Sequence, residues 1–163
     1  MNNMQAQVRD FRLKAGLSVS DTPRVIDPVD AQRHIQMIRD EFEKELVPAL
    51  HSGDLAGTYD GAIDLIYFLV GLLVDSGLNL QAGFDLAARS NLSKFGPNGE
   101  RYYYRDGDGS GEPDGKVKKG PDYFEPDWVM LINQLIGAHA RREGTIVSVH
   151  NPNGLKFPSD PAV

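Results

Sequence analysis

The sequence contains no cysteine among its 163 residues, which excludes disulfide bonds and thiolate metal sites. This absence fits a cytoplasmic protein without requiring one. Long apolar runs are also lacking, because the most apolar stretch, residues 62–74, is too short to span a bilayer and contains Asp64. No basic segment precedes an apolar one, so we expect no signal peptide and a cytoplasmic location, which is the host cytoplasm if a phage encodes the chain.

An excess of basic residues is absent as well, since 17 Lys and Arg stand against 23 Asp and Glu and give a net charge of −6. That balance argues against nonspecific binding to nucleic acid, and we expect no membrane partner either. An anionic substrate would need a metal ion to approach the acidic side chains of such a chain. With 40% hydrophobic and 25% charged residues, the composition predicts one compact soluble domain.

Hydrophobic spacing predicts an all-α fold. We expect helices over residues 3–17, about 28–51, about 58–77 and about 80–94, and a further helix after Pro126. Asp27 or Asp30 is expected to cap the second helix. Glycine, proline and charge dominate residues 97–126, where residues 101–105 and 116–119 are expected to form the strands of a short β-hairpin. Residues 145–149 fit either an edge strand or an extended arm.

Four acidic residues on two of these helices have the spacing of a divalent metal site. Asp60 and Asp64 lie one turn apart on the third helix, which is apolar nearly all round and is therefore expected to be buried. On the second helix, at about 100° per residue, Glu45 falls inside the apolar stripe and Glu41 falls on its edge. That stripe consists of Ile35, Ile38, Phe42, Leu46 and Ala49. Because buried carboxylates need a compensating cation or hydrogen-bond donors, we predict a metal site here.

The neighbouring acids have a different interpretation. Asp40 and Glu43 point to the opposite side of the second helix and are expected to lie on the surface. For Asp64, a structural role such as bonding a buried arginine or a helix N-terminus competes with metal binding. Tyr67 and Gly71 share the face of Asp64, where they offer a polar group and open space beside the acids.

Several segments together resemble the MazG-like all-α nucleoside triphosphate pyrophosphohydrolases of phages and bacteria. They are residues 38–46, 60–67, 89–94 and 114–120, then Pro126 and Asp127, while Val8, Phe11 and Gly16 fit the first helix of that family. The resemblance implies a helical bundle whose core helices are shared in a homodimer or a dimer of dimers. It places a pyrophosphohydrolase domain at residues 1–127. Residues 128–163 have no counterpart in that family and are expected to form a C-terminal helix and extended tail of the same domain.

One departure from the family pattern concerns the acids. The family usually has them three residues apart, whereas here they are four apart, and Gly61 stands where the common pattern has a glutamate on the second acidic helix. Both spacings keep the side chains on one helix face. The departure leaves Asp40 or Glu43 as alternative members of the first pair.

The resemblance implies hydrolysis of a nucleoside triphosphate to a monophosphate and pyrophosphate. Glu41, Glu45, Asp60 and Asp64 would hold Mg²⁺ or Mn²⁺, and Glu41 and Glu45 would also act in catalysis. By analogy with phage members, the expected substrate is a purine nucleotide, dGTP first, then GTP or dATP, for nucleotide-pool control or modified-DNA synthesis. The alternative is a noncatalytic helical factor that senses nucleotides or binds a protein.

Basic and polar side chains supply the candidate substrate contacts. Asn91 and Lys94 lie one turn apart near a helix end, where complementing the helix dipole is the competing interpretation. Lys116 and Lys119 lie in the hairpin segment and either close over the triphosphate or are merely solvated. The base is expected near Phe11 or Lys14 of the first helix.

Overall fold

The computed structural model describes residues 3–142, and within them the chain is helical, with no β-strand. The elements are α1 (Asn3–Lys14), α2 (Pro28–Asp40), the π-helical segment η1 (Glu41–Leu46), α3 (Val47–Ser52), α4 (Leu55–Asp75), α5 (Leu80–Leu92) and α6 (Trp128–Arg142). The predicted all-α fold is therefore confirmed. The expectation for residues 145–149 lies outside the described residues.

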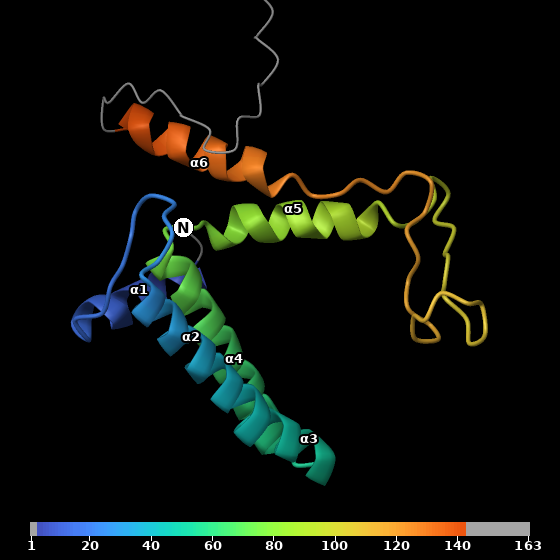
Figure 1. The fold of residues 1–163 in the computed structure, drawn as a ribbon, viewed down its shortest axis with the longest axis horizontal. Coiled ribbons are helices and arrows are strands. Elements are labelled where there is room, and N and C mark those ends of the chain that lie inside the picture. The colour runs from blue at the N-terminus through green and yellow to red at the C-terminus, as the bar shows by residue number, and fades with distance from the viewer. Residues whose placement is uncertain (1–2, 143–163) are drawn as a thin grey trace, which may run out of the picture.

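The predicted second helix is one continuous rod made of α2, η1 and α3 (Figure 1). Asp27 caps it by accepting a hydrogen bond from the Val29 backbone N–H at 2.8 Å. In the middle the helix widens into η1, and the Val47 N–H bonds to the Phe42 carbonyl, five residues back. Pro48 accounts for this wider turn, because it has no N–H and its ring would clash with the carbonyl four residues back in a regular helix.

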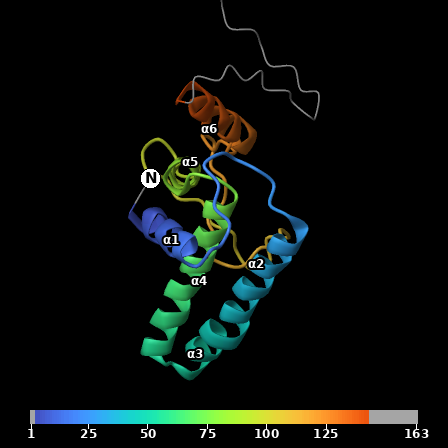
Figure 2. The same cartoon turned by 90° about the vertical axis from the view of Figure 1, so that its left-hand side faces the viewer.

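A tight turn sends the chain back along this rod. Gly53 adopts a left-handed conformation with φ of 69°, and Asp54 caps α4 by accepting a hydrogen bond from the Gly57 N–H at 3.0 Å. As Figures 1 and 2 both show, α4 then runs antiparallel beside η1 and α2. The two backbones come close at Gly61, where an added Cβ would lie 3.0 Å from the backbone nitrogen of Leu46.

Helix α1 packs against the C-terminal half of α4 (Figure 2). Val8 of α1 and Val70 and Val74 of α4 form a buried cluster, with Tyr67 and Leu80 partly buried beside it. This small core holds α1 over the last turns of α4. The N-terminal turns of α4, which carry the acidic residues, extend beyond it.

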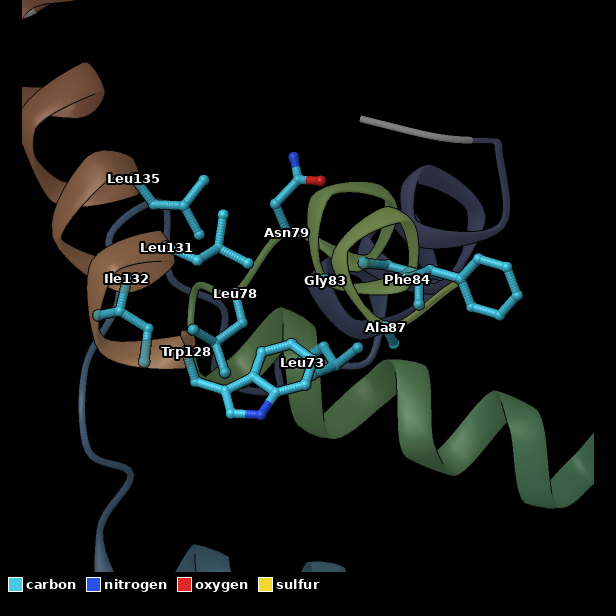
Figure 3. Close-up of a pocket in the computed structure, with 11 residues that line it drawn as sticks. Leu73, Leu78, Asn79, Gly83, Phe84, Ala87, Trp128, Leu131, Ile132 and Leu135 are labelled. Carbon is cyan, nitrogen blue, oxygen red and sulfur yellow. The ribbon is translucent and has the colours of Figure 1, made fainter. Parts of the chain in front are cut away.

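Helices α5 and α6 lie side by side across the C-terminal end of α4. Asn79 caps α5 through a hydrogen bond from the Ala82 N–H at 2.9 Å. A cavity of about 340 Å³ opens between the two helices, and Figure 3 shows Leu131 and Leu135 of α6 facing it, whereas the Phe84 ring of α5 points away. Its lining is almost entirely apolar and contains no carboxylate, so it is not the predicted metal site.

The segment between α5 and α6 contains the predicted hairpin pairing but no strands. Tyr103 and Val117 form an isolated antiparallel bridge, and the Lys118 N–H bonds to the Tyr102 carbonyl at 2.7 Å. The expectation of strands over residues 101–105 and 116–119 was wrong, because the pairing stops after these few hydrogen bonds. The return of this segment is attached to α5, where Ser90 Oγ donates to the Phe124 carbonyl at 2.8 Å.

The expected burial of α4 is wrong for the single chain. Leu55 is 82% exposed and Tyr59 is 72% exposed, and the same is true to a lesser degree of Ile63, Ile66 and Leu69. The reason is that neighbouring elements cover only part of the helix. By length and composition alone, α4 could cross a membrane, a test that the core helix of a soluble protein also passes.

Candidate metal and nucleotide site

The structure brings the predicted acids to one stretch of the helix pair. Glu41 begins η1 and Glu45 follows in the same segment, while Asp60 and Asp64 lie on α4, which packs against η1. The half-buried Glu41 is the centre of the group. Burial raises the pKa of its carboxyl group, and the negative charges of Asp64, Glu45 and Asp60 raise it further.

The outward acids differ in having basic partners. Asp40 accepts hydrogen bonds from Lys44 at 2.8 Å and from Gln36, and these lower the pKa of its carboxyl group. Glu43 lies 4.0 Å from Arg39. By contrast, within residues 3–142 the acids Glu41, Glu45, Asp60 and Asp64 form no ion pair. Asp40 and Glu43 therefore have compensating charges beside them, whereas the four acids of the predicted metal site do not within the described part of the chain, although Asp40 is more buried than Glu45.

The predicted burial of the inward acids is wrong for the single chain. Glu45, Asp60 and Asp64 are exposed, and Glu41 is half-buried. These acids lie at the edge of the contact between η1 and α4, where water still reaches them. Among the described residues, no three acidic or histidine side chains converge closely enough to hold a metal ion. Partial burial and, after it, repulsion by the neighbouring acids are thus the two unfavourable effects on the ionised Glu41.

Gly61 explains the departure from the family's usual acid spacing. Its position is buried against the rod, and a Cβ there would lie 3.0 to 3.2 Å from the nitrogen, Cα and Cβ of Leu46. A glutamate could not occupy this position without separating the helices. The acids of α4 therefore stand on either side of the close approach, at Asp60 and Asp64, opposite a π-helical segment of the kind that is frequent at functional sites.

An aromatic pair lies next to this acid cluster. Phe11 of α1 and Tyr67 of α4 meet edge to face with their ring centroids 5.8 Å apart, and Tyr67 follows Asp64 by one turn. Phe11 is 53% exposed, so part of its ring faces solvent. The space predicted at Gly71 is not open, because Arg12 and Val8 of α1 approach it.

The candidate basic contacts lie elsewhere and have local partners. Lys14 pairs with Asp10 at 2.7 Å at the exposed end of α1. The C-terminal end of α5 and the hairpin segment lie well away from the acid-bearing helix pair in Figure 1. In that region Lys94 donates to the side-chain oxygen of Asn91 at 2.6 Å, Lys116 pairs with Glu112, and Lys119 stacks on the Tyr123 ring. A single chain does not bring these cations to the acids.

The sequence interpretation missed the most buried charged side chain, Asp75, which is 1% exposed at the end of α4. Its carboxylate bonds to Arg12, a role of the kind considered above for Asp64. Its place directly after the apolar run and before the left-handed Gly77 was the available signal.

Comparison with known proteins agrees with this arrangement. Residues 8–91, more than half of the chain, match the phosphoribosyl-ATP pyrophosphohydrolase family, and the matched range includes all four acids and the aromatic pair. No curated protein matches the chain. The matched family is part of the MazG-like all-α nucleoside triphosphate pyrophosphohydrolases, and its members act on nucleotides of the triphosphate type. The chain belongs to the phosphoribosyl-ATP pyrophosphohydrolase family and is a pyrophosphohydrolase of that general kind.

Proposed function

We propose that the protein is a metal-dependent pyrophosphohydrolase that converts a purine nucleoside triphosphate to its monophosphate and pyrophosphate. The observation that carries this proposal is the set of carboxylates around Glu41, which repel one another and form no ion pair within the described residues, while Asp40 and Glu43 beside them are paired. Such repulsion is unfavourable in the free protein and is relieved by a cation.

The donor set fits Mg²⁺ or Mn²⁺, because both ions prefer oxygen ligands and every acid of the cluster offers carboxylate oxygens. When bound, the ion supplies positive charge that neutralises the triphosphate and lowers the pKa of a coordinated water. Asp60 and Asp64 would serve as ligands from α4, and Glu41 and Glu45 as ligands from η1, once their side chains turn toward one ion.

Glu41 and Glu45 also handle the proton. A carboxylate with a raised pKa, as Glu41 has, is the better matched acceptor for the proton of the attacking water. The water oxygen forms the new bond at the α-phosphorus, the bond from that phosphorus to the bridging oxygen breaks, and pyrophosphate leaves.

For the substrate we propose dGTP first, then GTP or dATP, for nucleotide-pool control or modified-DNA synthesis in a phage. The aromatic pair supports a purine, because Tyr67 follows Asp64 by one turn, Phe11 packs on Tyr67, and the two rings give a base an aromatic surface. Phosphoribosyl-ATP, named in the description of the matched family, is the second candidate and carries a purine and a triphosphate too.

We further propose a homodimer, or a dimer of dimers, in the cytoplasm. A groove between α2 and α4 is lined largely by apolar side chains, among them Ile35, Phe42, Leu65 and Leu69. A second copy would cover this face, in place of a membrane or nucleic acid, and its Asn91, Lys94, Lys116 and Lys119 could reach the triphosphate. Lys14 is proposed as a contact from the same chain.

The test is incubation with each triphosphate and with phosphoribosyl-ATP, in Mg²⁺ or Mn²⁺, followed by ³¹P NMR of the products. We expect a monophosphate and pyrophosphate with a purine substrate, and no turnover in excess EDTA. Orthophosphate as the sole inorganic product, or full activity in EDTA, would overturn the proposal. Nucleotide binding without turnover would favour the noncatalytic sensor instead.

Matched variants separate the inward acids from the outward ones. Glu45→Gln and Asp64→Asn should abolish turnover while the helical circular dichroism persists. Asp40→Asn and Glu43→Gln remove the same charge from the same region and should leave kcat within about twofold, because their partners are surface lysine and arginine. Equal losses at Glu43 and Glu45 would contradict the assignment.

A further inference from the structure

A buried polar network at the far end of the helix pair has no part in the proposed chemistry. Asp75 Oδ2 accepts hydrogen bonds from Arg12 Nη2 and His34 Nε2, each at 3.0 Å. Asp75 Oδ1 accepts from Ser18 Oγ at 2.8 Å and from Arg24 Nη2. These donors come from α1, from the connector after it and from α2, so one carboxylate ties three segments to the end of α4.

His34 is the member of this network that joins α2 to α4. The ring is 3% exposed, and Nε2 must carry a proton because the carboxylate it meets can only accept. Its other nitrogen, Nδ1, is buried without a hydrogen-bond partner within residues 3–142. The position is therefore held by a single directional bond to Asp75.

Three acids of the cluster, Glu41, Glu45 and Asp64, lie between this bond and the Gly61 contact, and Asp60 lies just beyond that contact. His34 precedes Glu41 by about two helical turns, and Asp75 follows Asp64 by about three. On the other side, Gly61 sits against Leu46. Glu41 stands at the junction of α2 and η1, where a wider helical turn can absorb a shift of one part relative to the other.

We propose that His34 and Asp75 are positioning residues for the acid cluster, because their hydrogen bond sets the register of α2 on α4 and hence the place of Glu41 relative to Asp64. The part of this inference that concerns activity rests on the proposed function. The part that concerns register does not. Neither residue touches the reacting atoms, and both act through the helices that carry the acids.

The first experiment measures the register directly. The chain has no cysteine, so spin labels at Gln36→Cys on α2 and Tyr59→Cys on α4 are unique. Labelled protein is diluted with unlabelled protein, so that only the distance within one chain is measured by pulsed electron paramagnetic resonance. His34→Asn, too short to reach Asp75, should shift the mean distance by about 1 Å or broaden it. His34→Gln places an amide N–H where Nε2 was and should restore it.

The control is Arg33→Gln, which removes the partner of Asp30 from the exposed side of the same helix. It should leave the distance unchanged. Because His34→Asn also removes a buried partner, it is measured in sucrose, which favours the folded state. An unchanged distance in folded His34→Asn, or the same change in His34→Gln, overturns the proposal.

The second experiment connects register with function. His34→Asn should weaken Mn²⁺ binding, measured by calorimetry, and lower kcat by about tenfold each, at the lower end of the range for groups that orient ligands. KM should stay within about twofold, because no substrate contact is lost. A lower melting temperature with unchanged Mn²⁺ affinity and kcat would overturn the link to the site. If the unmutated protein neither binds Mn²⁺ nor hydrolyses a triphosphate, the proposed function fails, while the spin-label distances still decide the register.

Discussion

Replacing Gly61 with alanine tests the close approach that underlies the whole site. Alanine is favoured over glycine inside a helix by about 1 kcal/mol. Against this gain, the new Cβ would lie 3.0 Å from the nitrogen and 3.1 Å from the Cα of Leu46, closer than ordinary contact. These are backbone atoms, so the helices must separate by a few tenths of an ångström. Overpacking of this kind costs about 1–3 kcal/mol, which leaves Gly61→Ala destabilised by about 0–2 kcal/mol.

The same separation moves η1 away from α4 and with it Glu41 and Glu45 from Asp60 and Asp64. We therefore expect Gly61→Ala to lower the affinity for Mn²⁺ even though the variant loses little or no stability. Urea unfolding gives the free energy, and calorimetry gives the affinity. Gly83→Ala in α5 is the control, because nothing lies within 4 Å of its added Cβ, and it should gain up to about 1 kcal/mol. If Gly61→Ala gained as much stability as Gly83→Ala and bound Mn²⁺ with unchanged affinity, the close approach at Gly61 would not control the site.

Three further predictions concern single side chains. Because the pKa of Glu41 is raised above 4.5 in the folded state, its ionised form lowers stability as the pH rises through that raised pKa. Glu41→Gln should therefore raise the melting temperature of the metal-free protein at neutral pH and change it little well below pH 4.5. A lower melting temperature of the variant at neutral pH would contradict this. If Lys94 contacts phosphate, Lys94→Ala should weaken triphosphate binding by about 1–3 kcal/mol. A loss of about 0.3–1 kcal/mol in stability with unchanged kinetics would instead show that Lys94 only stabilises the end of α5 beside Asn91. Asp75→Asn leaves the buried Arg12 uncompensated and should cost about 3–5 kcal/mol in urea unfolding. Asp30→Asn, at an exposed pair, should cost less than about 1 kcal/mol, and equal losses would contradict the role given to burial.

The helices could be predicted from the sequence because their signals are local. Asp27, Asp54 and Asn79 each cap the helix that follows, and Gly53 and Gly77 adopt the left-handed conformation just after a helix ends. The two segments that pair at Tyr103 and Val117 were also predictable, although the extent of their pairing was not. Each of these features depends on residues that lie close together in the chain.

The π-helical segment and the burial of the acids could not be predicted in the same way. A uniform rotation of about 100° per residue places Glu45 inside the apolar stripe. The π-helical segment η1 rotates less per residue, so the side chains from Glu41 onward point in directions that differ from this expectation. Burial depends on which faces find a partner. Ile35 and Phe42, expected inside, are 48% and 47% exposed, and Phe84 and Leu92 of α5 are each 66% exposed. Periodicity identifies an apolar face but not what covers it.

Charge compensation proves more informative about the acids than burial. Asp75 is the acid that lies deep in the protein, and it is matched by two arginines, so its burial has a structural explanation without any ligand. Burial raises the pKa of the Asp75 carboxyl group, but the hydrogen bonds from His34 and Ser18 and the charges of the arginines outweigh it and leave the pKa lowered. Glu41 is less buried, yet its neighbours are acids and its pKa is raised. The direction of the two shifts thus separates a carboxylate whose charge the fold compensates from one whose charge it leaves uncompensated, and the proposed metal ion would supply that compensation.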